Sequence, residues 1–272
     1  MACCSDAEIA LMKRFEIGYA RSTQSVMRRI ERKVCGCDYG GSSWTTRHQA
    51  DALLALLALD AGSELIDLGA GAGWPGLYLA KTSGCRVTLV DLPEIGLGLA
   101  EDRARRDGLA DRVSVRVADA SMLPFEPASF DAVSHSDLLC CLVSKRAVLS
   151  ECRRIIRPAG RMVFTVISIA PEVSETQHAR VLGAAPQFAD SDCAYETLLA
   201  ETGWQVISRS DLTEDYRLSC MRQAEADKTH RGELIELIGP EAVEERQASW
   251  SGKLSAIEDR LLLREQYACR PC

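Results

Sequence analysis

The sequence lacks the features that mark nucleic-acid-binding, membrane and secreted proteins. It has no excess of basic residues, since 32 Lys and Arg against 39 Asp and Glu leave a net charge of −7, whereas phosphate binding needs a basic surface. Its longest apolar run, residues 52–59, is far too short to cross a bilayer. Asp6 and Glu8 stand where a secretory signal would be basic. We therefore expect a cytoplasmic protein without a nucleic-acid or membrane partner.

Cysteine, in contrast, is abundant, but its pattern lacks the spacing of a metal site. The chain has 12 cysteines, and without an export signal we expect them to be reduced thiols. Cys35 and Cys37 have no second pair at zinc spacing, so no metal is expected. Internal repeats and low-complexity tracts are also missing. A chain of 272 residues suits one α/β domain with an elaborated lid.

The apolar pattern predicts strands and helices that alternate through most of the chain. Predicted strands cover residues 65–68, 86–90, 113–117, 130–134, 161–168, 205–211 and 261–268. Predicted helices cover residues 7–34, 95–107, 145–156, 195–202 and 216–250, the last broken near Gly239, and another runs from Thr45 or Thr46 to Gly62. Residues 35–43 read as a loop, residues 157–160 as a turn, and residues 171–193 as a short helix with a loop.

This alternation predicts a doubly wound, Rossmann-like α/β fold. We expect a seven-stranded, mostly parallel sheet with a reversed C-terminal hairpin. The long helical insert before the last strand cannot lie within the sheet. It is therefore expected to cover one edge as a helical lid, together with the N-terminus and residues 171–193.

A glycine-rich turn is the centre of the sequence. Residues 65–68 form a short apolar strand, and Gly69, Gly71 and Gly73 follow it directly. Glycines let the backbone turn sharply and approach a ligand closely. The helix that begins near Leu77 points its free amides back into the turn. Strand, turn and helix together predict a nucleotide-binding crevice.

Two ligands are compatible with this crevice. Gly71 to Gly76 satisfies the dinucleotide fingerprint G-x-G-x-x-G, and Asp91 lies at a suitable distance for a ribose contact. An NAD(P)-dependent oxidoreductase is therefore one interpretation. However, Asp67 precedes the glycines, where a carboxylate would repel a diphosphate but suits a cationic amino group. Asp119, after the third strand, is placed to read an adenine amino group. These acids favour S-adenosylmethionine.

Several ordered motifs resemble class I S-adenosylmethionine-dependent methyltransferases. They are closest to the ubiquinone/menaquinone-biosynthesis-like branch, which includes sarcosine and dimethylglycine methyltransferases. The motifs occupy residues 67–73, 87–91, 118–125, 129–133 and 151–161, so the resemblance covers roughly residues 35–170. It implies an N-terminal helical cap and cofactor-covering loop at 1–45, and a methyltransferase domain at 46–272 with lid insertions at about 171–194 and 216–258.

The resemblance also implies a site for S-adenosylmethionine, with S-adenosylhomocysteine as the product. Under or beside the methionine part it implies Asp67, Gly69, Ala70, Gly71, Gly73 and Ser134. For the ribose and adenine it implies Asp91, Leu92, Asp119 and Ala120. From the N-terminal loop it nominates Tyr39, Gly40 and Thr45.

The segment after the fourth predicted strand is expected to face a small-molecule methyl acceptor. His135 is a candidate general base because its pKa lies near working pH, although the favoured interpretation is that it packs at the strand end or hydrogen-bonds the cofactor. Asp137, Cys140 and Cys141 are candidate acceptor contacts. The paired cysteines also raise thiol-assisted methylation of arsenite. A further alternative is a non-catalytic, S-adenosylmethionine-binding regulatory protein. The acceptor atom stays open among carbon, nitrogen, oxygen and sulfur.

Overall fold

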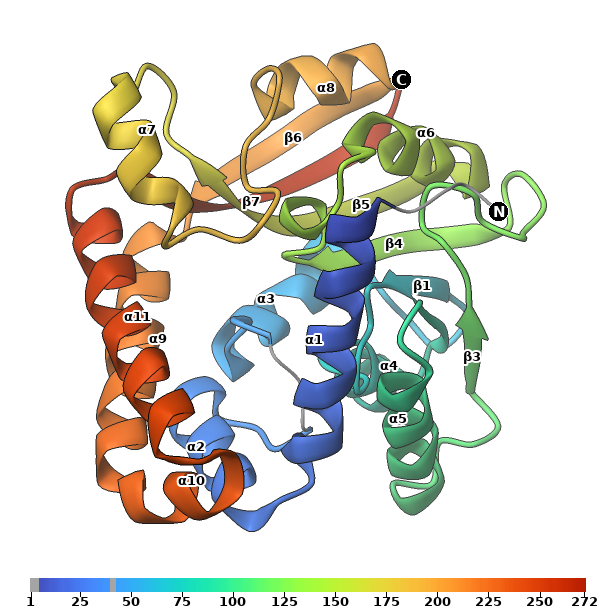
Figure 1. Cartoon of the computed structure of the whole chain (residues 1–272). Coiled ribbons are helices and arrows are strands. Elements are labelled where there is room, and N and C mark those ends of the chain that lie inside the picture. The colour runs from blue at the N-terminus through green and yellow to red at the C-terminus, as the bar shows by residue number, and fades with distance from the viewer. Residues whose placement is uncertain (1–4, 40–42) are drawn as a thin grey trace.

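A single twisted sheet organises the molecule (Figure 1). The computed structural model describes residues 5–39 and 43–272. The strands are β1 (Glu64–Leu68), β2 (Arg86–Asp91), β3 (Val113–Val117), β4 (Phe130–Ser136), β5 (Ile156–Ile169), β6 (Trp204–Asp211) and β7 (Leu262–Pro271). They form a seven-stranded sheet in the order β3-β2-β1-β4-β5-β7-β6. The first five strands pair in parallel, whereas β7 lies between β5 and β6 and is antiparallel to both. The reversed C-terminal hairpin is thus confirmed.

Helices cover both faces of this sheet, because its central strands are apolar on both sides. On one face lie α3 (Arg47–Leu57), α4 (Gly76–Ser83) and α5 (Glu94–Arg106), which bury Leu53, Leu77 and Leu97 against β1 and β2. On the other lie α6 (Lys145–Ile155) and α8 (Tyr195–Glu201), whose apolar residues pack with Phe164 of β5. The carboxyl ends of the parallel strands are left for the remaining helices to cover.

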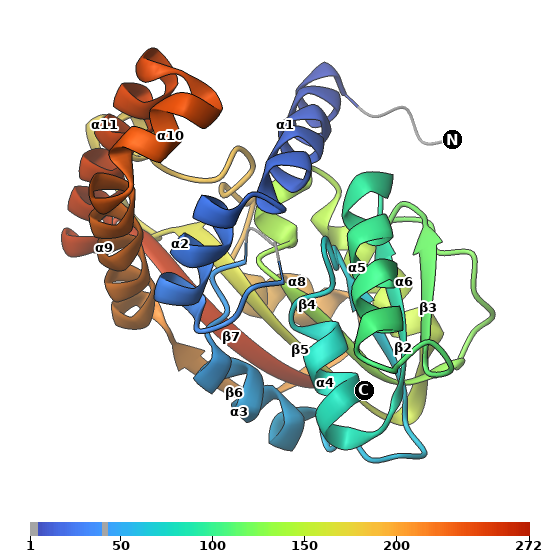
Figure 2. The ribbon, with the colours of Figure 1, turned by 90° about the horizontal axis from the view of Figure 1, so that it is seen from below.

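Those remaining helices gather over one end of the sheet (Figure 2). They are α1 (Asp6–Ser22), α2 (Ser25–Cys35), α7 (Glu175–Leu182), α9 (Thr213–Thr229), α10 (Arg231–Ile238) and α11 (Pro240–Glu258), with a short turn of helix, η1 (Leu139–Cys141). The N-terminal and C-terminal helices meet there, since α9 packs against both α2 and α11, and α1 packs against α5. None of the helices in the described part of the chain is long and apolar enough to cross a membrane.

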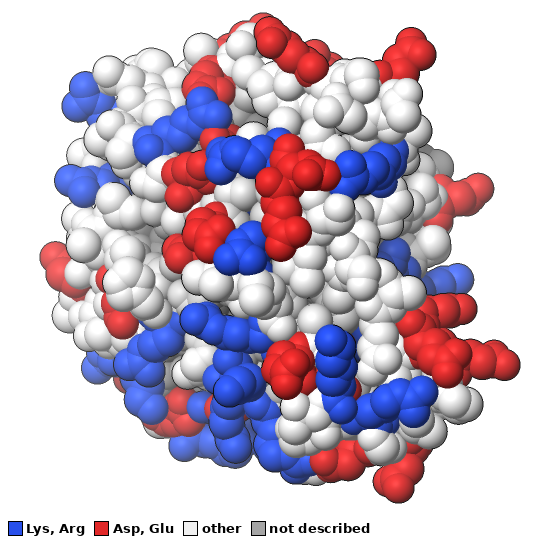
Figure 3. Space-filling view, turned by 90° about the vertical axis from the view of Figure 1, so that its left-hand side faces the viewer, with Lys and Arg blue, Asp and Glu red and all other residues white. Residues whose placement is uncertain are grey.

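The outer surface of this helical layer carries mixed charges. Figure 3 shows Lys and Arg interspersed with Asp and Glu on the side where α9 and α11 lie. Several of these charges form ion pairs, such as Arg217 with Glu214 of α9 and Arg231 with Glu244 across α10 and α11. The apolar and aromatic faces of the helices are therefore directed inward.

Several predicted boundaries differ from the structure, and three of the differences have a local reason. Helix α3 ends at Leu57, because Ala58 adopts a left-handed conformation with φ 53°, and Gly62 lies beyond it. Residues 157–160 were predicted as a turn, but β5 already begins at Ile156, and the shift in its pairing with β4 absorbs the extra residues. Strand β4 continues to Ser136, two residues beyond the predicted end, because β5 pairs with it that far.

Candidate functional site

The turn after β1 has a conformation that requires glycine. Gly69, Gly71 and Gly73 all have positive φ angles, of 66°, 51° and 95°. A Cβ atom on Gly71 would lie 2.6 Å from the hydroxyl oxygen of Tyr19, and one on Gly69 would lie 2.8 Å from Leu138. The absence of side chains therefore lets α1 and the segment after β4 close directly onto the turn.

A cavity of about 120 Å³ lies at the carboxyl ends of β1, β2 and β3. It brings together five of the residues predicted for the cofactor: Gly69, Asp91, Leu92, Asp119 and Ala120. Its cover is the inner face of α1, and its far wall includes Cys141 and Val148. The α1 contacts, Glu8, Leu11, Met12 and Phe15, were not predicted individually, although their spacing of three and four residues marks one helix face.

The Asp91 carboxylate is positioned by two backbone amides. It accepts hydrogen bonds from the amide of Gly71 at 2.8 Å and of Leu92 at 2.8 Å. Burial raises the pKa of Asp91 to about 6, against the effect of those two amides. Asp119 also lines the cavity and accepts hydrogen bonds from the amide and hydroxyl of Ser121. Two carboxylates thus reach the cavity from neighbouring strands.

Asp67 lies beneath the turn and does not line the cavity. It is 1% exposed, and it accepts hydrogen bonds from the Ser134 hydroxyl at 2.6 Å and the Gly76 amide at 3.1 Å. Burial, with a smaller contribution from the Asp91 carboxylate, raises the pKa of Asp67 to about 7 against the effect of the two hydrogen bonds. In this geometry Asp67 and Ser134 connect β1 and β4 to the start of α4. Ala70 is buried nearby, with its amide donating to the carbonyl of Val90.

The N-terminal loop residues lie to one side of the cavity. The Tyr39 ring packs against Trp74 and lies beneath the guanidinium of Arg103. Thr45 is buried and donates a hydrogen bond to the Ser136 hydroxyl at 3.1 Å. Gly40 lies outside the described residues. Neither Tyr39 nor Thr45 lines the cavity.

His135 is a core residue in this structure. It is 1% exposed and stacks on Phe164 with ring centroids 4.6 Å apart. Neither ring nitrogen has a hydrogen-bond partner within the described part of the chain. Burial lowers the pKa of His135 to about 3. A general base must reach the proton that it removes, and His135 does not line the cavity, so the geometry favours the packing interpretation.

The cysteines after β4 are held by the backbone. The thiols of Cys140 and Cys141 lie 3.0 and 3.6 Å from the carbonyl oxygen of Asp137, to which both donate. Cys140 is buried, whereas Cys141 lines the cavity. Among the residues that the structure describes, no group of three or more His, Cys, Asp and Glu is placed to hold a metal ion.

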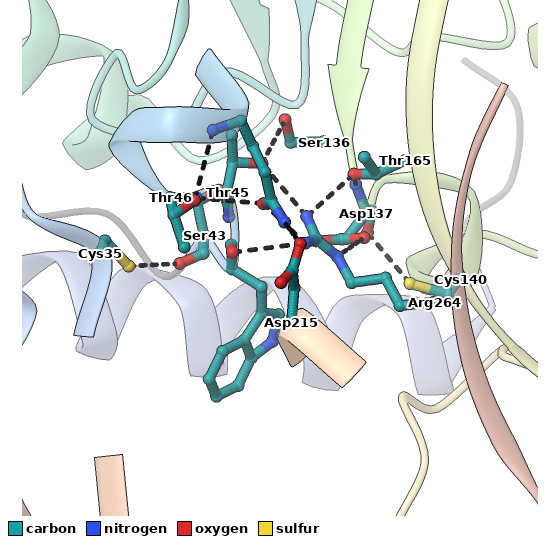
Figure 4. Close-up of polar contacts among 12 residues, drawn as sticks. Cys35, Ser43, Thr45, Thr46, Ser136, Asp137, Cys140, Thr165, Asp215 and Arg264 are labelled. Carbon is teal, nitrogen blue, oxygen red and sulfur yellow. Dashed lines mark hydrogen bonds and ion pairs between the residues drawn. The ribbon is translucent and has the colours of Figure 1, made fainter. Parts of the chain in front are cut away.

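Asp137, predicted to contact the acceptor, instead pairs with a buried arginine (Figure 4). Arg264 of β7 is 0% exposed, and its guanidinium lies 3.0 Å from the Asp137 carboxylate. The same guanidinium donates to Thr45, Thr165 and Gln49. Arg264 therefore joins the N-terminal loop, β4, β5 and α3. The sequence did not identify Arg264, because two adjacent charged residues in a strand, here Arg264 and Glu265, are typical of an exposed edge strand.

A second cavity, of about 230 Å³, lies among the helices that cover the sheet. Residues of α1, α2, α9 and α11 line it, together with Trp44 of the N-terminal loop. Its walls combine apolar side chains, such as Met27, Ile30 and Trp250, with the polar side chains of Glu31, Gln223 and Arg246. Helix α1 borders both cavities, because residues 8–15 line the first and Gly18 and Ser22 line the second.

Comparisons with known proteins identify the central domain. A family model described as a methyltransferase domain matches residues 66–164. Among curated relatives, methyltransferase GfsG of Streptomyces halstedii is 27% identical over 74% of this chain and 72% of its own length. The 27-O-demethylrifamycin SV methyltransferase of Amycolatopsis mediterranei is 29% identical over 71% of this chain and 72% of its own.

The fold has close counterparts among solved structures. Phosphoethanolamine N-methyltransferase 2 of Haemonchus contortus superposes with a TM-score of 0.75 at 21% identity, over 94% of this chain and 60% of that one. Residues 66–164 are thus a methyltransferase domain, and the chain is an S-adenosylmethionine-dependent methyltransferase.

Proposed function

We propose that the chain transfers a methyl group from S-adenosylmethionine to a nucleophilic atom of a small-molecule acceptor by in-line displacement. The observation that carries this proposal is the first cavity, where two carboxylates from adjacent strands lie beside the glycine-rich turn. When bound, the sulfonium supplies an activated methyl group. The protein then has to align the acceptor and exclude water, which can supply roughly 7–11 kcal/mol of the barrier.

The residues predicted for the cofactor have the following roles in this proposal. Asp91 accepts hydrogen bonds from the two ribose hydroxyls, and Leu92 packs on the adenine. Asp119, beside Ala120, accepts a hydrogen bond from the adenine amino group. Gly69, Gly71 and Gly73, with Ala70, form the turn under the methionine part.

Electrostatics support a cationic ligand over a dinucleotide. Asp67 lies beneath the turn and Asp91 beside it, and each in its ionised form raises the free energy of a further negative charge nearby. A diphosphate over the turn would add two charges of the same sign. S-adenosylmethionine instead brings a sulfonium and an ammonium, so Asp67 would act on the ammonium from beneath the turn.

The acceptor is proposed to enter from the side of α1, α2, α9 and α11, where the second cavity lies. The rifamycin relative acts on a small molecule by its name, which fits a site enclosed by helices. The arsenite alternative is not favoured, because the Cys140 thiol is buried and both thiols bond to the Asp137 carbonyl. A regulatory protein without activity is not favoured either, since the named relatives are methyltransferases.

The proposal is tested by methyl transfer and by cofactor affinity. Labelled S-adenosylmethionine is incubated with the protein and a small-molecule cell extract, and labelled products are identified by mass spectrometry. Calorimetric titration with S-adenosylhomocysteine then compares Asp91→Asn with Asp102→Asn, a matched change on the exposed surface of α5. We expect Asp91→Asn to weaken binding about tenfold or more, or about 1.4 kcal/mol, and Asp102→Asn to have no effect.

Two outcomes would contradict the proposal. Equal affinity of the wild-type protein and Asp91→Asn for S-adenosylhomocysteine would contradict the proposed hydrogen bonds between Asp91 and the ribose. Tight binding without label in any product would favour the regulatory protein.

A further inference from the structure

A lysine occupies an aromatic cage on the inner side of the helical layer. Trp44 and Trp250 meet edge to face, with ring centroids 5.9 Å apart at an angle of 85°. The ammonium of Lys253 lies 5.6 Å from the centroid of Trp44 and 5.2 Å from that of Trp250. Trp250 and Lys253 are three residues apart on α11 and therefore share one helix face. The cage is thus built from the N-terminal loop and α11.

This ammonium has no anionic partner. Within the part of the chain that the structure describes, Lys253 makes no hydrogen bond or ion pair. The two indole rings flank its ammonium. Burial lowers the pKa of Lys253, and Arg14 and Arg246 lower it further, whereas the thiols of Cys140 and Cys220 oppose the shift. The charge of Arg246 is already met by Asp227. Lys253 is half-buried, and a cation partly withdrawn from water without a carboxylate beside it is destabilised, so the site favours an incoming anion.

The two rings that flank the lysine also border the second cavity. Trp44 and Trp250 both line that cavity, through which the acceptor is proposed to enter. The Tyr216 ring packs against Trp44 with ring centroids 5.2 Å apart. The ammonium and the aromatic rings therefore lie at the edge of the proposed acceptor space. The Lys253 ammonium has three hydrogen-bond donors and no acceptor, and a hydrogen bond to an ionised acid group is among the strongest that it can make.

We propose that Lys253 binds an acid group of the methyl acceptor and excludes acceptors whose reacting end is a methylammonium. The proposal rests on the proposed function and specifies its substrate class: a small molecule with an apolar body and a carboxylate or phosphate. An empty cage of two tryptophans would attract a methylated ammonium through cation–π interaction. Here the lysine already covers both rings, so a second cation would meet like charge, and an anion would complete the ion pair.

Calorimetric titration with two matched probes tests this assignment. The probes are 4-hydroxybenzoate and 4-hydroxybenzylamine, which share the ring and phenol but carry opposite charge. Each is titrated into protein saturated with S-adenosylhomocysteine. We expect the carboxylate to bind about tenfold or more tightly than the amine in the wild-type protein. Lys253→Met should abolish this preference and Lys253→Arg should retain it, while Lys81→Met, an exposed lysine of α4, should leave it unchanged.

The result that would overturn the assignment is equally specific. Equal binding of both probes, no binding of the carboxylate, or an unchanged preference in Lys253→Met would each do so. The wild-type comparison needs no variant, so it decides the matter even where Lys253→Met fails to fold. Titration of S-adenosylhomocysteine alone separates the two proposals, because its failure to bind would contradict the cofactor site and not the acceptor site.

Discussion

The Nε atom of Arg264 donates to the carboxylate of Asp137 at 3.0 Å, although the two residues are 127 positions apart in the sequence. The pair joins β7, which lies between β5 and β6, to the segment after β4 that lines the first cavity at Leu138 and Cys141. Its remaining donors reach Thr45 and Thr165, so one side chain fixes the N-terminal loop against the sheet. Arg264 is therefore a positioning residue for the loop that carries Trp44.

Arg264→Met is expected to destabilise the fold strongly, because it leaves the Asp137 carboxylate buried without a cation. Breaking one partner of a buried pair typically costs about 3–5 kcal/mol. The double variant Arg264→Met/Asp137→Leu should recover part of this loss. Urea unfolding measures both, with Arg270→Met on the exposed part of β7 as the matched control. A loss no greater than that of the control would show that the pair has little effect on stability.

Gly71→Ala is expected to displace α1 from the glycine turn. The new methyl group would lie 2.6 Å from the Tyr19 oxygen, and the φ of 51° disfavours any side chain. We expect weaker binding of S-adenosylhomocysteine and faster proteolysis within α1. Gly98→Ala on α5 is the control, because a Cβ there meets nothing within 4 Å and should add up to about 1 kcal/mol of stability. Identical behaviour of the two variants would contradict this account of the turn.

His135→Phe should preserve methyl transfer and stabilise the protein at acidic pH. The folded state keeps His135 neutral down to about pH 3, whereas the unfolded chain protonates it near 6.5. The unfolded state therefore binds more protons between these values, and the free energy of unfolding falls as the pH falls below 6.5. Each pKa unit corresponds to about 1.4 kcal/mol. Urea unfolding at pH 5 and 8 should show the larger gain in the free energy of unfolding of His135→Phe at pH 5. Loss of turnover in this variant would instead indicate a catalytic role for His135.

Asp67→Asn should show the opposite dependence on pH. The folded state holds the proton of Asp67 up to about pH 7, whereas the unfolded chain releases it near 3.8. The folded state binds more protons in that interval, so the contribution of Asp67 to the free energy of unfolding falls as the pH rises through it. Relative to the wild-type protein, Asp67→Asn should gain stability between pH 4 and 8. A constant difference across this range would show that Asp67 is ionised throughout.

The sheet was predictable because its strands are short apolar runs with glycine and acidic residues at fixed ends. Val113–Val117 was predicted with its observed limits, and the antiparallel position of β7 agrees with the expected hairpin. The start of β5 was not predictable from residues 157–160, whose Pro158 and Gly160 are typical of a turn. Their extended conformation depends on pairing with β4, which is a contact between distant segments.

The residues of the candidate site were likewise predictable only in part. Gly69, Asp91 and Asp119 follow strand ends, and parallel strands bring such residues to one edge, so their convergence in a cavity was foreseeable. Arg264 and Lys253 were not foreseeable, because each owes its environment to a partner more than a hundred residues away in the chain. For His135, periodicity gives a position at a strand end but cannot show which side chains pack against it.

Strand β7 enters the sheet between β5 and β6 although it is the last of the seven strands along the chain. During synthesis, β5 and β6 must therefore wait with unpaired edges while the three helices before β7 leave the ribosome. A nascent chain at that stage also exposes the Asp137 carboxylate without its arginine. Open strand edges of this kind invite aggregation, so we expect this intermediate to depend on chaperones.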